Sequence, residues 1–259
     1  MRENAIKRTL EAGGTVLGMM CAEFSTSGIS RLADAAGADF VLYDMEHTGW
    51  SIETIKGLLA ASRGSTCTPL VRMSTLQRHM VSRPLDLGAA GVMVPMVESA
   101  EDARRIVDLA RFPPQGSRGV GVYYPDDIES SGLPDTLERM NANQFLIAQI
   151  ETVAGVEHAA EIIAVDGIDI LWIGHFDLTT SLGVPGQFGH PLHVEAVDRV
   201  FAAADAAGKP VGTMANDVED ARALLARGYR AVMYCDAMLF PAALAAALSA
   251  VRPPQRNAT

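Results

Sequence analysis

The sequence has few cysteines and no long hydrophobic stretch. Among its 259 residues, the only cysteines are Cys21, Cys67 and Cys235, which are far apart and form no Cys-x-x-Cys pair. This number and spacing argue against a disulfide framework or a structural zinc site, and suit a reducing compartment. No run of about 18 uncharged apolar residues occurs, and the charged N-terminus leads into no apolar segment. We therefore expect neither export nor a membrane span, and a cytoplasmic location.

Positive charge is also scarce. Lys and Arg total 21 against 31 Asp and Glu, which gives a net charge of −10. A surface for nucleic acid or an anionic membrane would be a local exception in such a chain, so we expect neither partner. The balance still permits a small anionic substrate, because one buried arginine is enough to bind it.

Short apolar segments alternate with amphipathic ones along the whole chain. The segments expected to be strands are Thr15–Met20, Phe40–Asp44, Pro69–Arg72, Gly91–Pro95, Phe145–Ile150, Ile168–Ile173, Pro210–Thr213 and Ala231–Tyr234. The segments expected to be helices are Ser51–Ser62, Ser99–Leu109, Gly155–Ala164, Leu192–Ala207, Val218–Arg227 and Ala242–Val251. Several strands are apolar throughout, as expected when both faces of a sheet are covered.

Eight strands alternating with helices predict one closed parallel (β/α)8 TIM barrel spanning residues 1–259. The alternative is an open doubly wound sheet. The count of eight, and the lack of a Gly-rich dinucleotide loop after the first strand, favour the barrel. One irregular insertion, Phe112–Leu137, is rich in Gly, Pro, Tyr and Asp, and is a candidate lid or intersubunit element.

Ionisable residues follow several of the expected strands. In a (β/α)8 barrel, catalytic groups lie where the strands end, at one mouth of the barrel. The segments expected at this mouth are Asp44–His47, Arg72, Gln149–Thr152, Gly174–Leu178 and Cys235-Asp236.

Glu151 and Asp177 are the candidate metal ligands. Mg²⁺ and Mn²⁺ prefer carboxylate oxygens and keep water or substrate in their remaining positions. Two carboxylates from neighbouring strands would let a 2-oxo acid chelate the ion through its keto and carboxylate oxygens. The alternative is that both residues only cap the helices that follow them.

Arg72 and His47 are the other candidates at the mouth. An arginine there can bind a carboxylate or an enolate oxygen through two hydrogen bonds, or pair with Asp44 or Glu46 as a structural salt bridge, and these roles are compatible. His47 is the best acid–base candidate, because histidine titrates near neutrality. The remaining histidines, apart from the ambiguous His175, are expected to face solvent; they are His79, His158, His190 and His193.

The number and positions of the lysines distinguish between two mechanisms for enolising a keto acid. A Schiff-base aldolase needs a buried lysine amine aimed at the substrate carbonyl. The chain has only Lys7, Lys56 and Lys209, and none is expected at the mouth. Activation by a metal is the remaining way to enolise a keto acid.

At these residues the chain resembles the HpcH/HpaI aldolase family of metal-dependent class II pyruvate aldolases. Members act on compounds such as 2,4-dihydroxyhept-2-ene-1,7-dioate or 2-keto-3-deoxy sugar acids, and have a barrel of the phosphoenolpyruvate/pyruvate type. The matching segments span nearly the whole chain in order: Leu42–His47, Val71-Arg72, Leu85–Gly88, Val94–Val97, Pro113–Gly121, Gln149–Thr152, Gly167–Asp169 and Gly174–Gly183.

The resemblance implies a role for each matched residue. Glu151 and Asp177 would bind Mg²⁺, Mn²⁺ or Co²⁺, and Arg72 would contact the keto-acid oxygens. His47 would govern proton transfer through a metal-bound water. The other residues with implied roles are Asp86 as partner of His47, Asp44 as support for the acid–base cluster, and Gln149 and the Gly174–His175 region as lining of the keto-acid pocket.

The resemblance also implies an assembly and contains two departures. Family members are typically hexamers in which the last helix packs on a neighbour's barrel, and the apolar Ala242–Val251 is compatible with this. Asp86 lies just before the fourth strand, at the wrong end of its own barrel, so it is expected to act in a neighbouring subunit. The family usually has proline at the positions of Met73 and His175, and the segment from Val122 to Leu137 does not match its pattern.

The expected reaction is cleavage of a 4-hydroxy-2-oxo acid to pyruvate and an aldehyde, and the reverse addition. The rivals are oxaloacetate decarboxylation, lysis of a CoA ester as in citrate-lyase-like barrels, and a non-catalytic barrel that binds a keto acid. A CoA substrate would need a basic groove, and no cluster of Lys and Arg lies near the expected mouth. The aldehyde itself stays undetermined.

Overall fold

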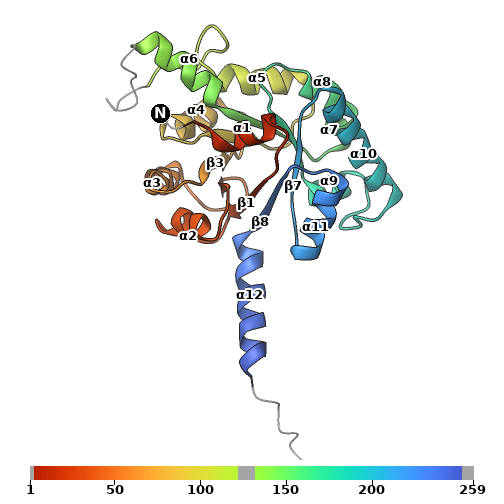
Figure 1. The fold of residues 1–259 in the computed structure, drawn as a ribbon. Coiled ribbons are helices and arrows are strands. Elements are labelled where there is room, and N and C mark those ends of the chain that lie inside the picture. The colour runs from red at the N-terminus through yellow and green to blue at the C-terminus, as the bar shows by residue number, and fades with distance from the viewer. Residues whose placement is uncertain (1–2, 122–131, 253–259) are drawn as a thin grey trace, which may run out of the picture.

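The computed structural model describes residues 3–121 and 132–252, and shows eight parallel strands that close into a barrel (Figure 1). Each strand pairs with the next along the chain, and the first also pairs with the eighth. The predicted (β/α)8 barrel is confirmed. The strands are β1 (Val16–Cys21), β2 (Phe40–Asp44), β3 (Thr68–Arg72), β4 (Gly91–Val94), β5 (Phe145–Ile150), β6 (Ile170–Ile173), β7 (Val211–Met214) and β8 (Ala231–Cys235).

The helices of the described residues lie mostly around the barrel, and the last of them points away from it (Figure 1). They are α1 (Ala5–Glu11), α2 (Ile29–Ala35), α3 (Ile52–Ser62), α4 (Arg78–Asp86), α5 (Ala100–Ala110), α6 (Leu133–Asn143), α7 (Val153–Glu157), α8 (Ala159–Ile163), α9 (His175–Ser181), α10 (Pro191–Ala206), α11 (Val218–Arg227) and α12 (Asp236–Val251). Five of the six predicted helices appear singly with shifts at their ends, and the sixth, Gly155–Ala164, is split between α7 and α8 at His158.

The insertion predicted as irregular over Phe112–Leu137 is partly helical. Helix α6 begins at Leu133, inside that range, with Pro134 in its first turn, where a missing N–H costs nothing. Residues 122–131 lie outside the described residues, as does the tail 253–259.

Two apolar layers position the mouth. Inside the barrel, large side chains from consecutive strands fill the axis, and the rings of Phe40 and Trp172 meet edge to face at 6.5 Å. Gly18 and Gly212 make room for them, because a Cβ at either position would overlap those rings. The second layer lies between the strands and the helices. The barrel is therefore a packed core, and functional groups are confined to its ends.

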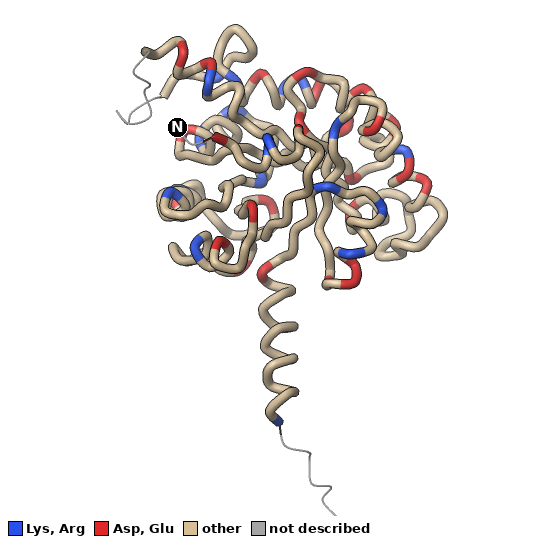
Figure 2. Tube along the Cα trace, viewed as in Figure 1, with Lys and Arg blue, Asp and Glu red and all other residues tan. Residues whose placement is uncertain are grey.

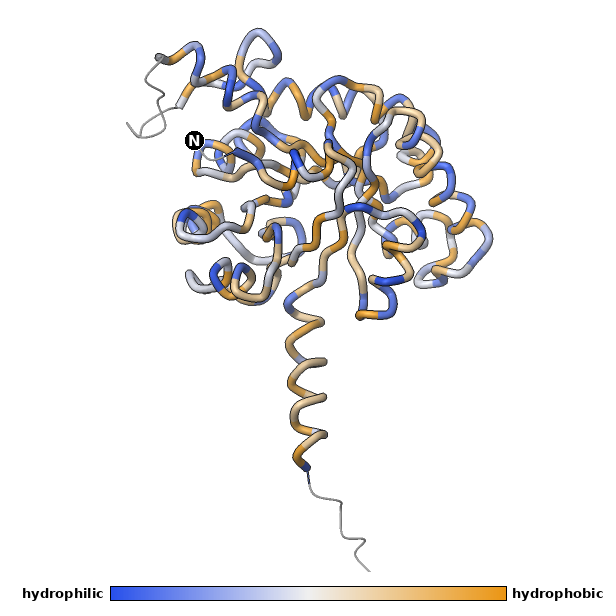
Figure 3. The backbone as a smooth tube through the Cα atoms, viewed as in Figure 1, coloured by the Kyte–Doolittle hydropathy of each residue, from blue (hydrophilic) through white to orange (hydrophobic). Residues whose placement is uncertain are grey.

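Helix α12 projects away from the barrel (Figure 1). No charged residue occurs between Asp236 and Arg252, so the projecting part is uncharged and mainly hydrophobic (Figures 2 and 3). Its side chains are exposed from Ala237 onward, including Phe240, Leu244 and Leu248. In the described part of the chain, we find no helix with the length and apolar character needed to cross a bilayer.

Candidate active site

The strands β2 and β3 deliver a buried ion pair to the mouth. Arg72 donates from Nε to Oδ1 of Asp44 at 2.7 Å and from its second terminal nitrogen to Oδ2 at 2.9 Å. Its other terminal nitrogen lies 3.2 Å from Oε2 of Glu46. Because the carboxylate of Asp44 also accepts the backbone N–H groups of Glu46 and His47, it fixes the turn that follows β2. Arg72 thus makes both predicted salt bridges while lining the cavity at the mouth.

Burial by itself would raise the pKa of Asp44, but its hydrogen bonds and ion pair with Arg72 outweigh burial and hold that pKa below the usual value. Asp44 is therefore ionised, and serves as a fixed anchor for the guanidinium.

Glu46 is a site residue to which the sequence analysis gave no role of its own. Burial raises its pKa, and the charges of Asp44 and Asp177 add to this effect while Arg72 and His47 oppose it. From the sequence, Glu46 was considered only as an alternative partner of Arg72. Its place between Asp44 and His47, in a segment expected at the mouth, is the signal that could have identified it as a site residue. It adds a third carboxylate to the mouth.

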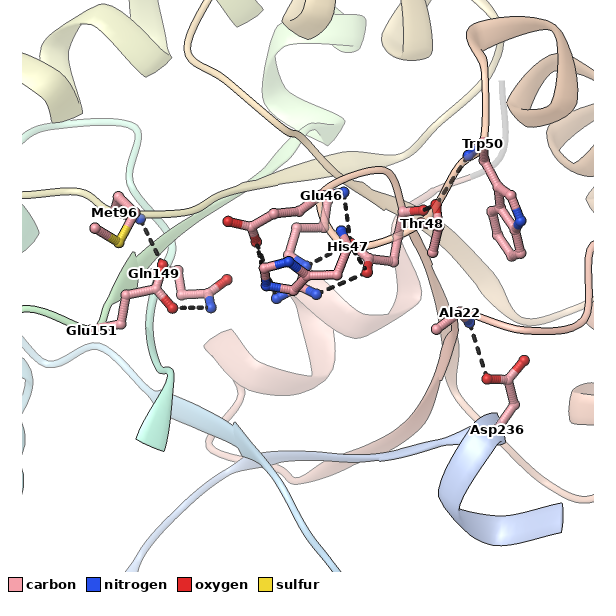
Figure 4. A network of polar contacts seen from close by, with 11 residues as sticks. Ala22, Glu46, His47, Thr48, Trp50, Met96, Gln149, Glu151 and Asp236 are labelled. Carbon is pink, nitrogen blue, oxygen red and sulfur yellow. Dashed lines mark hydrogen bonds and ion pairs between the residues drawn. The ribbon is translucent and has the colours of Figure 1, made fainter. Parts of the chain in front are cut away.

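Glu151 follows β5 and is buried, with 2% of its surface exposed. One carboxylate oxygen accepts the backbone N–H of Met96 at 2.8 Å, and the other accepts the side-chain amide of Gln149 (Figure 4). Met96 has φ 55°, a left-handed backbone conformation that is costly for a residue with a side chain. In this conformation its N–H donates to Glu151. Burial, together with the charges of Glu46 and Asp177, raises the pKa of Glu151 to about 7.

Gly174 and Asp177 come from the segment after β6. A Cβ at Gly174 would overlap the carboxylate of Glu151, so glycine is needed for the two segments to approach so closely. Asp177 is exposed in the first turn of α9, and its charge contributes to the pKa of Glu151. The charges of the two predicted ligands therefore interact.

The predicted ligands do not cap the following helices. Thr152, not Glu151, caps α7 by accepting the N–H of Gly155, and α9 begins at Gly174 without a side-chain cap. In the described residues, no three His, Cys, Asp or Glu side chains converge into a complete ligand set. A buried carboxylate with a raised pKa, a second carboxylate beside it, and an unpaired buried Oε1 of Gln149 make an oxygen-only donor set. Such a set fits a hard divalent cation with open positions.

His47 lies at the rim of the same cavity, with 63% of its side chain exposed and its Nε2 3.8 Å from Oε2 of Glu46.

Asp236, at the opposite side of the mouth, accepts the backbone N–H groups of Ala22, Glu23, Phe24 and Ala237, and so fixes the start of α12 (Figure 4). Its carboxylate is fully engaged there.

His175 is half-buried and lies in a hydrogen-bonded chain. Its Nδ1 is 2.9 Å from Nε2 of His193, and its Nε2 is 3.3 Å from the hydroxyl of Tyr229. His193 was expected to face solvent, and this was wrong: it is 3% exposed, because its ring packs against those of His175 and Phe188 and its Nδ1 donates to the carbonyl of Phe188 at 2.7 Å. His79 and His158 are exposed as expected, and His190 is half-buried.

Asp86 is not at the mouth of its own barrel. It ends α4 and pairs with Arg118 at 2.6 Å, in a cavity lined by Asn4, Thr68 and Gln144 at the opposite end of the strands. The three lysines are also away from the mouth. Lys7 pairs with Asp169, Lys209 donates to the carbonyls of Ile163 and Ile168, and Lys56 is exposed on α3.

A cavity of about 430 Å³ joins the residues of the mouth, among them His47, Arg72, Gln149, Gly174 and Asp177. These features define a (β/α)8 barrel with carboxylates and a buried arginine at an open mouth. The family model described as "HpcH/HpaI aldolase/citrate lyase" matches residues 19–237. The chain belongs to this family, and is an aldolase by that relationship.

The relatives confirm the resemblance read from the sequence. The hydroxypyruvate/pyruvate aldolase of Delftia acidovorans is 37% identical, over 85% of this chain and 81% of that protein. The 2-keto-3-deoxy-L-rhamnonate aldolase of Salmonella gallinarum is 31% identical, over 99% and 96%. The crystal structure of an HpcH/HpaI aldolase from Desulfitobacterium hafniense superposes with a TM-score of 0.89 at 33% identity, over 96% of this chain and 97% of that one.

A more distant structure shares the fold alone. The citrate lyase β subunit of Mycobacterium tuberculosis, solved with oxaloacetate and magnesium, is 21% identical with a TM-score of 0.59, over 95% of this chain and all of that one.

Proposed function

We propose that this protein cleaves 4-hydroxy-2-oxo acids to pyruvate and an aldehyde, and catalyses the reverse addition, as a class II aldolase. The observation that carries the proposal is that Asp177 and Arg72 line one cavity and that the charge of Asp177 acts on the buried carboxylate of Glu151. The aldolase relatives support the same chemistry.

Glu151 and Asp177 would hold a divalent cation, Mg²⁺, Mn²⁺ or Co²⁺. A cation bound there supplies a Lewis acid that polarises a keto oxygen and stabilises negative charge as it develops on that oxygen. The raised pKa of Glu151 supports this assignment, because a buried carboxylate without a cationic partner is costly to ionise. Gly174 keeps the approach to Glu151 open.

Arg72 would orient the keto acid and stabilise the enolate oxygen. Its guanidinium is held in place by two hydrogen bonds to Asp44, so little reorganisation is needed when charge develops. Gln149, Gly174 and His175 line the same cavity and would shape the keto-acid pocket. These residues act mainly through binding and orientation.

His47 would move the protons. In cleavage, the 4-hydroxyl loses its proton, the C3–C4 bond breaks, and its electron pair forms the pyruvate enolate while C4 leaves as an aldehyde. Return of the proton to C3 then gives pyruvate, so the reaction needs no further reactant. His47 lies at the rim, beside Glu46, where a water molecule can carry the proton.

A homo-oligomer, a hexamer or trimer, would complete the site. The uncharged α12 leaves apolar side chains exposed along its whole projecting length, which is costly for an isolated chain in water (Figure 3). We propose that it packs on a neighbouring barrel, and that the Asp86 of one subunit serves the His47 of another. Size-exclusion chromatography with light scattering tests this, and a monomeric Leu244→Lys variant with full activity would contradict it.

The reaction is tested by release of pyruvate from 4-hydroxy-2-oxopentanoate. Activity should be lost with EDTA and restored by Mg²⁺ or Mn²⁺. Full activity in EDTA, or covalent trapping of substrate by borohydride, would replace the metal mechanism with a Schiff base.

A further inference from the structure

The cavity at the mouth extends well beyond the groups that would bind a keto acid. A three-carbon keto acid leaves much of a 430 Å³ cavity unfilled, since pockets for drug-sized ligands begin at about 300 Å³. The remaining part lies next to Asp177. It is lined by the rings of Phe176 and Phe188 and by Met214 and Leu224, and His175, from the keto-acid pocket, packs against Phe188.

The rings of this extension already pack edge to face. The centroid of Phe188 lies 5.0 Å from that of Phe176 and 6.2 Å from that of His175. Phe176 is 53% exposed, so one of its faces is free to meet a ligand. Edge-to-face clusters of this kind accept a further ring at similar spacing.

The polar atoms of the extension are engaged with one another. Because the carbonyl of Phe188 can only accept, Nδ1 of His193 donates to it, and Nε2 of His193 must accept from Nδ1–H of His175. Nε2 of His175 then accepts from the hydroxyl of Tyr229. Both ring nitrogens of both histidines are therefore used, and present no donor to a hydroxyl group of a ligand.

The charged groups of the extension are paired as well. Arg227 binds Asp198 at 2.7 Å and lies over the ring of Phe201, while Asp220 accepts hydrogen bonds from Asn216. The other arginine of the cavity, Arg72, is bound to Asp44 and Glu46. Among the described lining residues, a carboxylate or phosphate on the aldehyde would find no unpaired arginine or lysine.

We propose that this extension is the acceptor subsite, and that it selects an uncharged aromatic aldehyde. Resting on the proposed function, the inference names the substrate class: 4-hydroxy-2-oxo acids with an aryl group on C4, which are cleaved to pyruvate and an aryl aldehyde. Phe176 and Phe188 are its specificity-determining residues.

The experiment compares kcat/KM in the cleavage direction for three substrates in the Mg²⁺-loaded enzyme: 4-hydroxy-2-oxo-4-phenylbutanoate, 4-hydroxy-2-oxopentanoate and 4-hydroxy-2-oxoheptanedioate. The phenyl compound should exceed both others by about tenfold or more, as apolar burial of a ring predicts. A phenyl compound that is equal to or poorer than the others would overturn the inference.

Substitutions test whether Phe188 is responsible for the preference for the phenyl substrate. Phe188→Ala should lower the ratio of kcat/KM for the phenyl substrate to that for 4-hydroxy-2-oxopentanoate about tenfold, and Phe188→Leu should restore part of it. Phe24→Ala is the matched control, because Phe24 is half-buried and does not line the cavity. An unchanged ratio in Phe188→Ala, or an equal fall in Phe24→Ala, would contradict the assignment.

A separate measurement distinguishes failure of this inference from failure of the proposed function. Exchange of the C3 protons of pyruvate in D₂O needs enolate formation but no acceptor. Exchange without a phenyl preference would refute the subsite alone, whereas absence of exchange and of cleavage would refute the aldolase assignment. Saturation-transfer NMR with benzyl alcohol gives a readout independent of turnover, and its signal should be lost in Phe188→Ala.

Discussion

The two ends of the barrel handle charge in opposite ways. At the end where the strands begin, Asp86 pairs with Arg118, Lys7 pairs with Asp169, and Lys209 donates to two carbonyls. At the mouth, Glu46 and Glu151 are buried with raised pKa values, and Asp177 adds a further negative charge. One arginine, Arg72, serves this group, and it is already bound to Asp44.

This difference separates stability from function. Paired charges with satisfied hydrogen bonds contribute to a stable fold, whereas a cluster of like charges is tolerated where a ligand or a cation compensates it. The mouth should therefore lose function, and not stability, when its acidic groups are neutralised. At the other end, the pair of Lys7 and Asp169 should behave in the reverse way.

The largest effect is expected for Glu151→Gln. Loss of this carboxylate removes one of two proposed ligands, so kcat should fall by about 10³-fold and Mn²⁺ affinity should fall with it. The melting temperature of the metal-free protein should stay equal or rise, because a buried unpaired carboxylate is removed. Mn²⁺ titration by EPR and thermal unfolding measure these quantities. Wild-type affinity for Mn²⁺ in this variant would remove Glu151 from the metal site.

The second effect is expected for Arg72→Lys. Lysine keeps the charge but lacks the planar fork that binds Asp44 through two hydrogen bonds. We expect kcat to fall by about 10²-fold, with a stability loss of about 1 kcal/mol. Steady-state kinetics measure the change in kcat, and chemical unfolding measures the change in the free energy of unfolding. A large loss of stability with turnover unchanged would make Arg72 a structural residue only.

The third effect is a dependence of stability on pH in the metal-free protein. The folded pKa of Glu151 is about 7, above its usual value of 4.5, so the folded protein holds a proton that the unfolded chain has released. The stability linked to that proton is complete below pH 4.5 and is lost as the pH rises through about 7. The loss is about 3 kcal/mol. Glu46 acts in the same direction, since burial also raises its pKa.

The comparison with Glu151→Gln isolates this contribution. The pKa values of His175 and His193 are lowered by burial, so these groups favour unfolding as the pH falls below about 6.5 and oppose the slope from Glu151. The two histidines contribute equally to the wild type and to Glu151→Gln, so their contributions cancel in the difference between the two unfolding free energies. If the difference in unfolding free energy between wild type and variant does not vary from pH 4.5 to pH 8, the buried carboxylate is not protonated as described.

Most of the barrel could be predicted from the sequence because its signals are local. Strands that are apolar throughout, such as Phe145–Ile150, stand out from the amphipathic segments around them, and the structure reproduces this strand without a shift. The short helix α9 was not predicted, because Gly174–Leu178 was interpreted only as the functional segment that follows the strand. Helix α6 was not predicted because its Gly- and Pro-rich surroundings suggest a loop.

The site was predicted as a set of residues, and less well as an arrangement. Because parallel strands end at one mouth, Glu151, Asp177, Arg72 and His47 could be grouped from their places after strands. The burial of His193 could not be predicted, because it depends on contacts with His175 and with the ring and carbonyl of Phe188, which only the tertiary fold brings together. The strained backbone at Met96, which aims its N–H at Glu151, has no signature in residue type.

The smallest effect, and the one that completes the comparison, is expected for Lys7→Met. Lys7 lies 3.0 Å from Asp169, and both side chains are about 15% exposed, so the pair is only partly screened by water. Its Nζ also donates to the carbonyl of Gln144 at 3.1 Å. Loss of both contacts should cost about 1 kcal/mol and lower the melting temperature by about 2–4 °C, with kcat and KM unchanged. One charge removed at this end thus lowers stability without lowering turnover, whereas one charge removed at Glu151 lowers turnover without lowering stability. A fall in kcat of Lys7→Met comparable to that of Glu151→Gln would show that the two ends are coupled, and that the separation of stability from function does not hold.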